Sequence, residues 1–555
     1  MSKAKLPSRG SRTRLDPGMI VVAAAALIAF YPALFGGFVW DDAFYIKNNP
    51  ILELSMGSAI VPIATRVVVG NYHPLTVASL ALDHALFGPG PLFFHVTSVL
   101  LHAANAVLAG WLFLALGLRR DASWAGALLW AVHPLRVESV AWISGRKDVL
   151  YVFFFLSALL AYLRHVKEDD GAGRSYGLSL ALFVASALSK GMAVAFVPVL
   201  FLVDWFVGRR PTRNSIVEKI PFVVLGLVFG IGALVAQKGA GAIPLSRSYG
   251  LAGRLAIACY GLAFYAMKTL APWGLSAFYP YPNAAPGQLP TPAILAVVAG
   301  AAAVAVLVWK RKPWRAAVFS AGFYVATVAL VLQVVPVGSA VAADRYTYLP
   351  AVAVSFLIAA GLSALPFRRS IAAIVVVVAL LLSGATWARC AVWRDGLTLW
   401  NDVLATYPDV WFAHLNRGLA RAERGDHRGA IADYDIALAA SPRFAETWAS
   451  RASSKAALGD LDGAIAEFHK AVRIDPARPV YWFNLGLTLG DKGRWDDALA
   501  SLGEAIRLKP DFAEAYLNRG LALEQAGRAA EGAADVKRAK ALGYPVRPDV
   551  LGRFE

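Results

Sequence analysis

Two adjacent carboxylates, Asp41 and Asp42, follow the first apolar stretch of the chain, where it would leave a lipid bilayer. Charge close to hydrocarbon is costly, so an acidic pair is uncommon there unless it has a use. A carboxylate at this place can act as a general base, and two close acids repel each other, which raises the pKa of one of them. The pair is therefore the first candidate for catalysis. The simpler interpretation is that it caps a helix or lies at the interface.

Ionisable side chains in several other loops fall on the same predicted side of the membrane as this pair. They are His73, Glu138, Arg146, Lys147, Lys190, Lys238, Arg247, Asp344 and Arg345. Acids and bases from separate loops predict one polar site at the outer interface. A transporter would more often place its ionisable groups near the bilayer midplane, on interrupted helices. The pattern therefore favours chemistry at the outer surface.

The composition sets the class of protein that holds these residues. The chain has 555 residues, of which 58% are hydrophobic, and a mean hydropathy of +0.53, which predicts a polytopic membrane protein. The net charge of +17 lies mostly in short loops, where it sets topology, and no nucleic-acid-binding module accompanies it, so we expect no nucleic acid partner. Cys259 and Cys390 lie in or beside apolar segments and predict neither a disulfide framework nor a thiolate metal site.

The basic loops predict the topology. Residues 1–17 form a basic cytoplasmic tail, and residues 18–390 form a helical membrane domain with about 11 crossings. Residues 251–271 are long enough to cross the membrane. Counting them as a crossing would place two clusters of basic loop residues on the outer side of the membrane. We therefore interpret them as an interfacial or re-entrant helix, with a crossing as the alternative. The C-terminal region then lies outside the cytoplasm.

A 34-residue repeat fills the region 395–555. Small residues recur in register at Gly418, Ala452, Gly486 and Gly520, and prolines close three of the units. This pattern is typical of tetratricopeptide repeats, in which small residues stand where paired helices touch. It predicts an α-solenoid that begins with a half-repeat and continues with four units at about 411–444, 445–478, 479–512 and 513–546.

The repeat array predicts a concave surface that binds an extended protein or peptide. Asn416, Asn484 and Asn518 recur at one position on the first helix of their units, and Ser450 takes that position in the second unit. A carboxamide has both a donor and an acceptor, so it can hold a peptide backbone without reading its sequence. The alternative is that these residues are ordinary solvated helix positions.

Several segments of the membrane domain match a known family. They are Phe38-Val39-Trp40-Asp41-Asp42, residues 72–76, residues 94–105, residues 133–148 and Asp344-Arg345-Tyr346-Thr347-Tyr348-Leu349-Pro350. Through them, and through the order of membrane domain and repeats, the chain resembles the transmembrane and tetratricopeptide repeat-containing proteins. Asp344 stands where we expect glutamate, and the alanine-, glycine- and arginine-rich composition suggests a bacterial inner-membrane protein.

The resemblance implies a type-C glycosyltransferase fold and an activity like that of the protein O-mannosyltransferases. The donor would be a mannose-like sugar on a polyprenyl phosphate. The acceptors would be Ser or Thr hydroxyls of extracytoplasmic proteins bound by the repeats, and the transfer would proceed with inversion.

The resemblance and the chemistry together assign roles to the outer residues. Asp41 or Asp42 would be the general base. The cations for the donor phosphate would be Arg345 first, then Arg146, Lys147 and Lys190. The substrate contacts would be His73, Glu138 and Tyr279. Glu138 has the alternative role of pairing with a nearby arginine, and Tyr279 that of an interfacial aromatic residue.

Three other interpretations stay open. A non-catalytic scaffold that recruits partners through its repeats would not need the acidic pair. A transporter of lipid-linked sugar would place its charges at the midplane. If the sugar is transferred to a glycan or a lipid instead of a protein, the repeats would serve only for assembly. Within the enzyme interpretation, one acid could instead hold Mg²⁺ or Mn²⁺ against the phosphate, although we assign no metal ligands.

Overall fold

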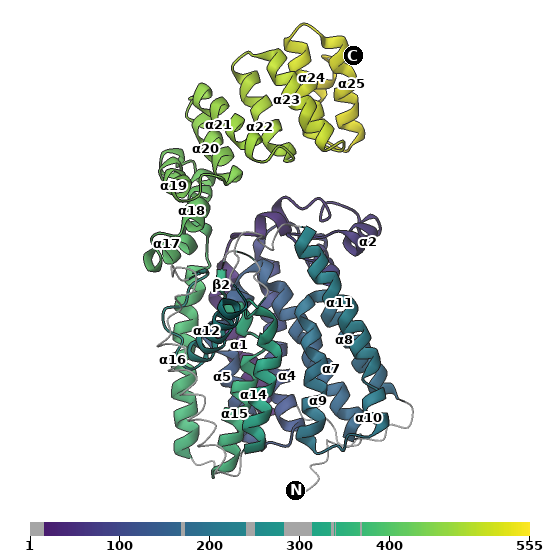
Figure 1. The fold of residues 1–555 in the computed structure, drawn as a ribbon, viewed down its shortest axis with the longest axis vertical. Helices are drawn as coiled ribbons and strands as arrows, with labels where there is room; N and C mark the ends of the chain where they lie inside the picture. Colours follow the sequence, from purple (N-terminus) through teal and green to yellow (C-terminus); the bar gives the residue numbers. More distant parts are fainter. Residues whose placement is uncertain are drawn as a thin grey trace. The chain divides into compact units, whose positions relative to one another are not determined.

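The computed structural model describes residues 16–167, 173–239, 250–281, 314–334, 338, 340–366 and 369–554. The chain divides into two compact units, Met1–Leu399 and Trp400–Glu555. The described residues are mainly helical, and the one sheet among them pairs β1 (Tyr279–Pro280) antiparallel with β2 (Ala340–Ala342). The predicted all-α class, with a helical membrane unit followed by a repeat solenoid, is confirmed (Figure 1).

Six helices in the described part of the first unit are long and apolar enough to cross a membrane. They are α1 (Pro17–Ala29) with η1 (Tyr31–Phe35), α4 (Pro91–Ala115), η4 (Ile143–Gly145) with α7 (Arg146–Lys167), α10 (Arg213–Val217) with α11 (Ile220–Gly239), α14 (Trp314–Val328) with η6 (Ala329–Val331), and α16 (Arg369–Val392). The helix α12 (Leu251–Leu270) is not among them. The total of about 11 crossings remains a prediction. Residues 293–309, one of the stretches counted in that total, lie outside the described residues.

These helices differ in how far the protein buries them. The apolar stretches of α4 and α7 are each 61% buried, whereas those of α11 and α16 are 11% and 17% buried. The first two therefore form the centre of the bundle, and the last two expose apolar side chains as lipid-facing helices do. The chain is a membrane protein on this evidence. Shorter helices complete the packing: α3 (Pro74–Phe87), α5 (Arg120–Ala131), α8 (Arg174–Ser189), α9 (Phe196–Val207) and α15 (Ala351–Ala364).

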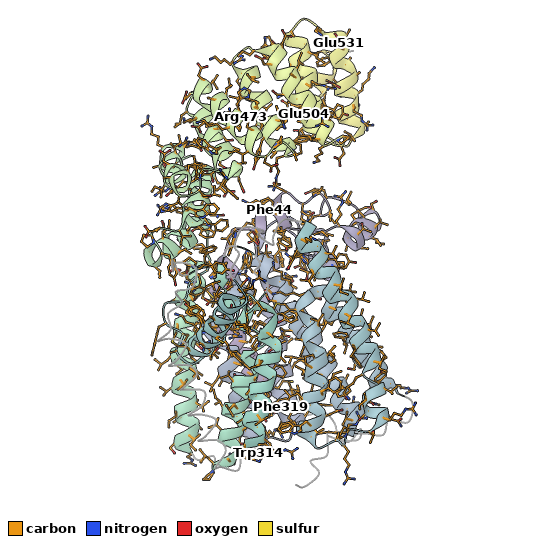
Figure 2. All side chains as sticks on the ribbon, in the orientation of Figure 1. Phe44, Trp314, Phe319, Arg473, Glu504 and Glu531 are labelled. Atoms are coloured by element: carbon orange, nitrogen blue, oxygen red, sulfur yellow. The ribbon has the colours of Figure 1, made fainter. Side chains whose placement is uncertain are left out.

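Irregular segments between the helices carry the predicted site residues. The first loop contains η2 (Ala43–Lys47) and α2 (Met56–Thr65). The block 133–148 folds as η3 (Pro134–Arg136), α6 (Val137–Ala141) and η4 before α7 begins. Two further short segments are η5 (Gly191–Ala195), which precedes α9, and η7 (Asp344–Thr347), which follows β2. Phe44 in the first loop and Trp314 at the start of α14 lie at opposite ends of the helix bundle (Figure 2).

The second unit is a stack of paired helices in the register that the repeat predicts. The pairs are α18 (Trp411–Glu423) with α19 (His427–Ala440), α20 (Ala445–Ala457) with α21 (Leu461–Ile474), α22 (Pro479–Asp491) with α23 (Trp495–Leu508), and α24 (Ala513–Gln525) with α25 (Ala529–Ala541). α17 (Gly396–Thr406) precedes them, and α26 (Pro548–Leu551) follows. A Cβ at Gly418 would lie 2.5 Å from the Tyr434 ring, so the small residue is needed where the helices touch.

Close packing of α5 against α15 depends on Gly126. A Cβ there would lie 2.8 Å from both the Ala359 Cβ and the Ser355 carbonyl oxygen, whereas a Cβ at Gly361, also on α15, meets nothing within 4 Å. We expect Gly126→Val to lower the stability by about 1–3 kcal/mol through overpacking, and Gly361→Val to lower it less. Thermal unfolding of the purified variants in detergent measures the difference. Equal midpoints for the two variants would contradict the close contact.

Candidate active site

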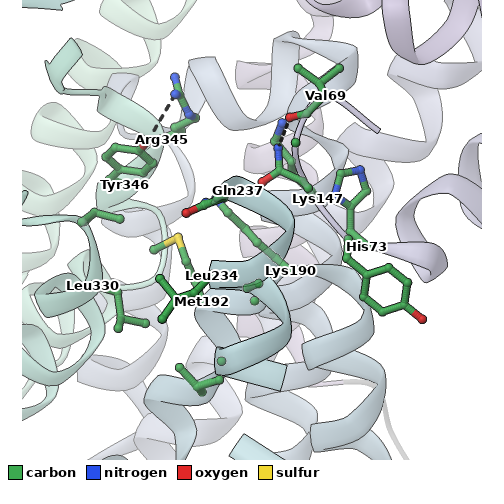
Figure 3. Close-up of a pocket in the computed structure, with 18 of the residues that line it drawn as sticks. Val69, His73, Lys147, Lys190, Met192, Leu234, Gln237, Leu330, Arg345 and Tyr346 are labelled. Carbon is green, nitrogen blue, oxygen red and sulfur yellow. Dashed lines mark hydrogen bonds between the residues drawn. The ribbon is translucent and has the colours of Figure 1, made fainter. Parts of the chain in front are cut away.

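A cavity of about 700 Å³ opens in the first unit among the first loop, η5, α11, η6 and η7. One part of its lining is polar and includes Asp41, His73, Lys147, Lys190 and Arg345. The other part is apolar and includes Met192, Val194, Val197, Val223, Leu227, Ile231, Leu234, Leu330 and Val331. Arg345 and Tyr346 lie on one side of the cavity, and Lys147 and His73 lie on the other (Figure 3). The cavity therefore offers one charged region and one wall suited to hydrocarbon.

The two adjacent acids have different surroundings. Asp42 is fully buried, and its carboxylate accepts hydrogen bonds from the Val39 N–H at 3.0 Å, the Ser144 N–H at 2.8 Å and the Ser144 hydroxyl. Asp41 lines the cavity, and no described residue gives its carboxylate a hydrogen bond or an ion pair. Asp42 therefore joins the first loop to the block 133–148, and Asp41 is the acid that can meet a ligand.

The backbone at three cavity residues is strained. Trp40, Val69 and Gln333 are the non-glycine residues with positive φ in the described chain, at +53°, +47° and +59°, and all three line the cavity. Such a conformation costs of order 1–3 kcal/mol per residue and persists only where the surroundings impose it. Strain of this kind gathers at ligand sites, so its convergence here supports a functional role for the cavity.

The three cations of the cavity differ in whether a carboxylate already neutralises them. Lys190 pairs with Asp148, and Arg345 pairs with Glu138, which also accepts the Arg345 backbone N–H at 2.8 Å. Lys147 is only 8% exposed, yet no carboxylate of the described residues lies within ion-pair distance of it.

The Lys147 ammonium is held instead by aromatic groups. It lies 4.9 Å from the Tyr45 ring centroid and 5.0 Å from that of Trp142, and it donates to the Tyr45 hydroxyl at 3.5 Å. A buried ammonium without a counter-ion is unfavourable. The polar region therefore presents an ammonium outside any ion pair of the described residues, beside the Asp41 carboxylate.

Besides Asp42, three of the predicted site residues of the membrane unit do not line the cavity. The buried Arg146 guanidinium binds Asp83 and the hydroxyl of Ser98, so it holds α3, α4 and α7 together. Glu138 is occupied by Arg345. The Tyr279 hydroxyl donates to Asp344 at 2.7 Å. None of the three is among the residues that line the cavity, and of the partners named here only Arg345 lines it. Their direct contact with a ligand stays a prediction.

Burial changes the titration of the groups in the first loop. It raises the pKa of Asp41 above its ordinary value, although the positive charges of Lys147 and Arg345 oppose the shift. It raises the pKa of Asp42 to about 7, against the hydrogen bonds from Ser144 and Val39. It lowers the pKa of His73 to about 3, with help from Lys147 and Lys190, so this imidazole is neutral at physiological pH. His73 stacks on Tyr45, with 5.4 Å between the ring centroids.

The predicted peptide-binding asparagines of the second compact unit each lie on the first helix of a helix pair. The amide nitrogens of Asn416 and Asn518 each donate to the carbonyl four residues earlier, at 2.8 Å. Their carboxamide oxygens are thus the groups that can meet a ligand, together with the part-exposed Asn484. No three His, Cys, Asp or Glu side chains gather as metal ligands within the described ranges.

Some cavity residues have no role in the sequence prediction. Trp40, Trp142 and Tyr346 lie inside the segments that carry the family resemblance, so that pattern could have indicated them. The apolar wall from α11 has no such signal, because a lipid-facing span and a hydrocarbon-binding wall have the same composition.

Two family models match the repeats. The one described as TPR repeat matches residues 452–493 and 489–527, and the one described as tetratricopeptide repeat matches residues 393–443. Among solved structures, MamA protein matches 27% of this chain and 85% of its own at 22% identity, with a TM-score of 0.25.

Curated relatives match the chain over about a third of its length. Protein O-mannosyl-transferase F38B6.6 of Caenorhabditis elegans is 26% identical over 39% of this chain and 32% of its own. Protein O-mannosyl-transferase TMTC1 of Mus musculus is 32% identical over 36% of this chain and 24% of its own. Protein O-mannosyl-transferase TMTC4 of Homo sapiens is 29% identical over 36% of this chain and 31% of its own. The chain thus spans between a quarter and a third of the length of these relatives. The predicted resemblance is confirmed.

The unequal surroundings of the two acids predict unequal effects on stability. Asp42→Asn replaces a carboxylate oxygen by an NH₂ group that cannot accept from Val39 or Ser144, and we expect it to cost about 2–4 kcal/mol. Asp41→Asn breaks no hydrogen bond and should change stability by less than about 1 kcal/mol. Thermal unfolding midpoints in detergent compare the two. A larger loss for Asp41→Asn would contradict these assignments.

Proposed function

We propose that this protein is an integral-membrane glycosyltransferase that moves a sugar from a polyprenyl-phosphate donor to hydroxyl groups of proteins outside the cytoplasm. The observation that carries the proposal is the composition of one cavity. A carboxylate to which no described residue gives a hydrogen bond or ion pair, a buried lysine outside ion-pair distance of every described carboxylate, and an apolar wall lie together there. A lipid phosphate has an anionic head and a hydrocarbon tail, so it matches both halves. The relatives' name, protein O-mannosyl-transferase, supports transfer to protein.

The donor would bind with its head and tail in different surroundings. Lys147 supplies a positive charge that is in no ion pair with the described carboxylates, and Arg345 and Lys190 extend the positive field around the phosphate. The tail lies against α11, whose apolar stretch is only 11% buried within the protein and so borders the bilayer. His73, which lines the cavity, would be a contact for the substrate.

Asp41 is the proposed general base. It takes the proton of the acceptor hydroxyl while the acceptor oxygen forms a bond to the anomeric carbon. The bond from that carbon to the phosphate oxygen breaks, and its electron pair leaves with the lipid phosphate, which the cations stabilise. Among the described residues, Asp41 is the one acid that lines the cavity. A single carboxylate fits one direct displacement with inversion, because retention needs a second carboxylate as nucleophile.

The acceptor would be a protein segment held by the repeats. Asn416, Asn484 and Asn518 repeat along the first helices of the stack, and each offers a carboxamide to an extended backbone. The sugar, which we expect to be mannose-like, and a bacterial inner-membrane location with extracytoplasmic repeats are parts of the same proposal.

Transfer of labelled sugar from a panel of polyprenyl-phosphate sugars to membrane proteins tests the proposal. We expect Asp41→Asn to lower transfer by about 10²–10⁴-fold, because general-base catalysis contributes that much. Glu53→Gln, which removes an exposed acid of the same loop outside the cavity lining, should leave transfer unchanged. Full transfer by Asp41→Asn would overturn the role of this residue. Absence of transfer by folded wild type with every donor would favour a scaffold.

The acid side of the pH–rate profile should depend on Lys147. Asp41 must be ionised to accept a proton, so activity falls as the pH drops through its raised pKa, above the ordinary value of 3.8. The positive charge of Lys147 lowers that pKa, so Lys147→Gln should move the acid limb of kcat/KM to higher pH and raise the KM for the donor. Profiles for wild type and variant measure the shift. An unmoved limb would mean that another group limits the rate in acid.

A further inference from the structure

Trp40 stands directly before the proposed base and forms an aromatic wall of the cavity. Its ring stacks on that of Trp142, with 5.1 Å between the centroids and an interplanar angle of 17°. Trp142 is 1% exposed, whereas Trp40 is half-buried and lines the cavity. A buried tryptophan therefore backs the Trp40 ring and fixes its orientation.

The backbone at Trp40 gives a second reason to assign it a role. At a φ of +53°, a residue with a Cβ is disfavoured by about 1–2 kcal/mol, and glycine would relieve the strain. The surrounding contacts hold the conformation: the Val39 N–H donates to Asp42, and the Trp142 indole N–H donates to the Val39 carbonyl at 3.3 Å. A large aromatic side chain thus occupies a position where the backbone would favour glycine, which points to a function for the ring.

The Trp40 ring lies near Arg345, which is assigned to the phosphate, and Trp40 directly precedes Asp41, the proposed base. The guanidinium carbon of Arg345 is 5.9 Å from its centroid, and Asp41 is the next residue in the chain. A phosphate on the cations and a hydroxyl at Asp41 would have the sugar between them. The π face of an indole is electron-rich, so it attracts the C–H face of a sugar ring and the positive charge that develops on that ring during transfer.

We propose that Trp40 is the platform on which the hexopyranose ring of the lipid-linked donor stacks. The contact holds the anomeric carbon within reach of the hydroxyl at Asp41. This inference rests on the proposed function and deepens it, because it assigns the sugar to one residue and separates sugar recognition from recognition of the lipid phosphate.

Binding measurements on the full-length protein test the platform separately from the proposed function. The probes are a polyprenyl phosphate alone and the same lipid carrying mannose, glucose, galactose or N-acetylglucosamine. For each variant and each sugar, the dissociation constant of the bare lipid phosphate divided by that of the sugar-bearing lipid measures the contribution of the sugar. We expect one sugar lipid to bind wild type about tenfold more tightly than the bare lipid phosphate.

The variants separate the loss of the Trp40 ring from the relief of the backbone strain at this position. Trp40→Leu and Trp40→Gly should bring the ratio close to one and leave affinity for the bare lipid phosphate unchanged, while Trp40→Phe should keep most of the preference. Glycine suits a φ of +53°, so Trp40→Gly remains informative if Trp40→Leu fails to fold. Trp387→Leu, which removes a half-exposed tryptophan of α16 outside the cavity lining, is the matched control.

Each outcome supports or overturns a defined claim. A ratio that survives in Trp40→Gly, or that is already one in wild type, overturns the platform. An equal loss of affinity for both lipids in Trp40→Gly also overturns it and makes Trp40 a structural residue. Failure of wild type to bind the bare lipid phosphate overturns the proposed function and this inference with it. A ratio lost in Trp40→Gly and retained in Trp40→Phe and Trp387→Leu supports the platform.

Discussion

The carboxylate of Asp42 is the interaction on which the site depends. By accepting from Val39 on one side and Ser144 on the other, it joins two segments that lie about 100 residues apart in the chain. This junction fixes the stretch that contains Trp40 and Asp41, and it also fixes the turn from which α7 begins. Lys147 is in the first turn of α7. One buried acid thus joins the segment that carries the proposed base to the segment that carries Lys147.

The acids and cations around the cavity balance one another, and three of the cations are held in ion pairs. Asp83 binds Arg146, Asp148 binds Lys190, and Glu138 binds Arg345. These pairs hold the charges in place, because a buried ion pair loses several kcal/mol when one partner leaves. Lys147 forms no such pair within the described chain, but the charge of Asp41 acts on it, so its positive charge is uncompensated only once Asp41 has taken up a proton. Preorganised charges of this kind stabilise a leaving anion without rearrangement of the protein.

The sequence predicted the parts of this structure that depend on local pattern. The repeats, the acidic pair and the block 133–148 all come from residues close together in the chain. Which of Asp41 and Asp42 faces the cavity could not be predicted. The two side chains follow Trp40, whose backbone is left-handed, and tryptophan in a sequence does not indicate that conformation. Arg146 and Lys147 are neighbours on a helix, yet only Lys147 lines the cavity. Pairs such as Glu138 with Arg345 form across the fold and leave no local pattern.

The apolar wall on α11 determines where a lipid-linked substrate would be found. Because this helix is hardly covered by protein, such a molecule would reach the cavity sideways, by diffusion within the plane of the bilayer, and would never enter water. The quantity that governs occupancy is then the mole fraction of the substrate among the membrane lipids rather than its bulk concentration. The far end of a long prenyl chain would extend among the lipids beyond the protein, so carriers of different lengths would be treated alike.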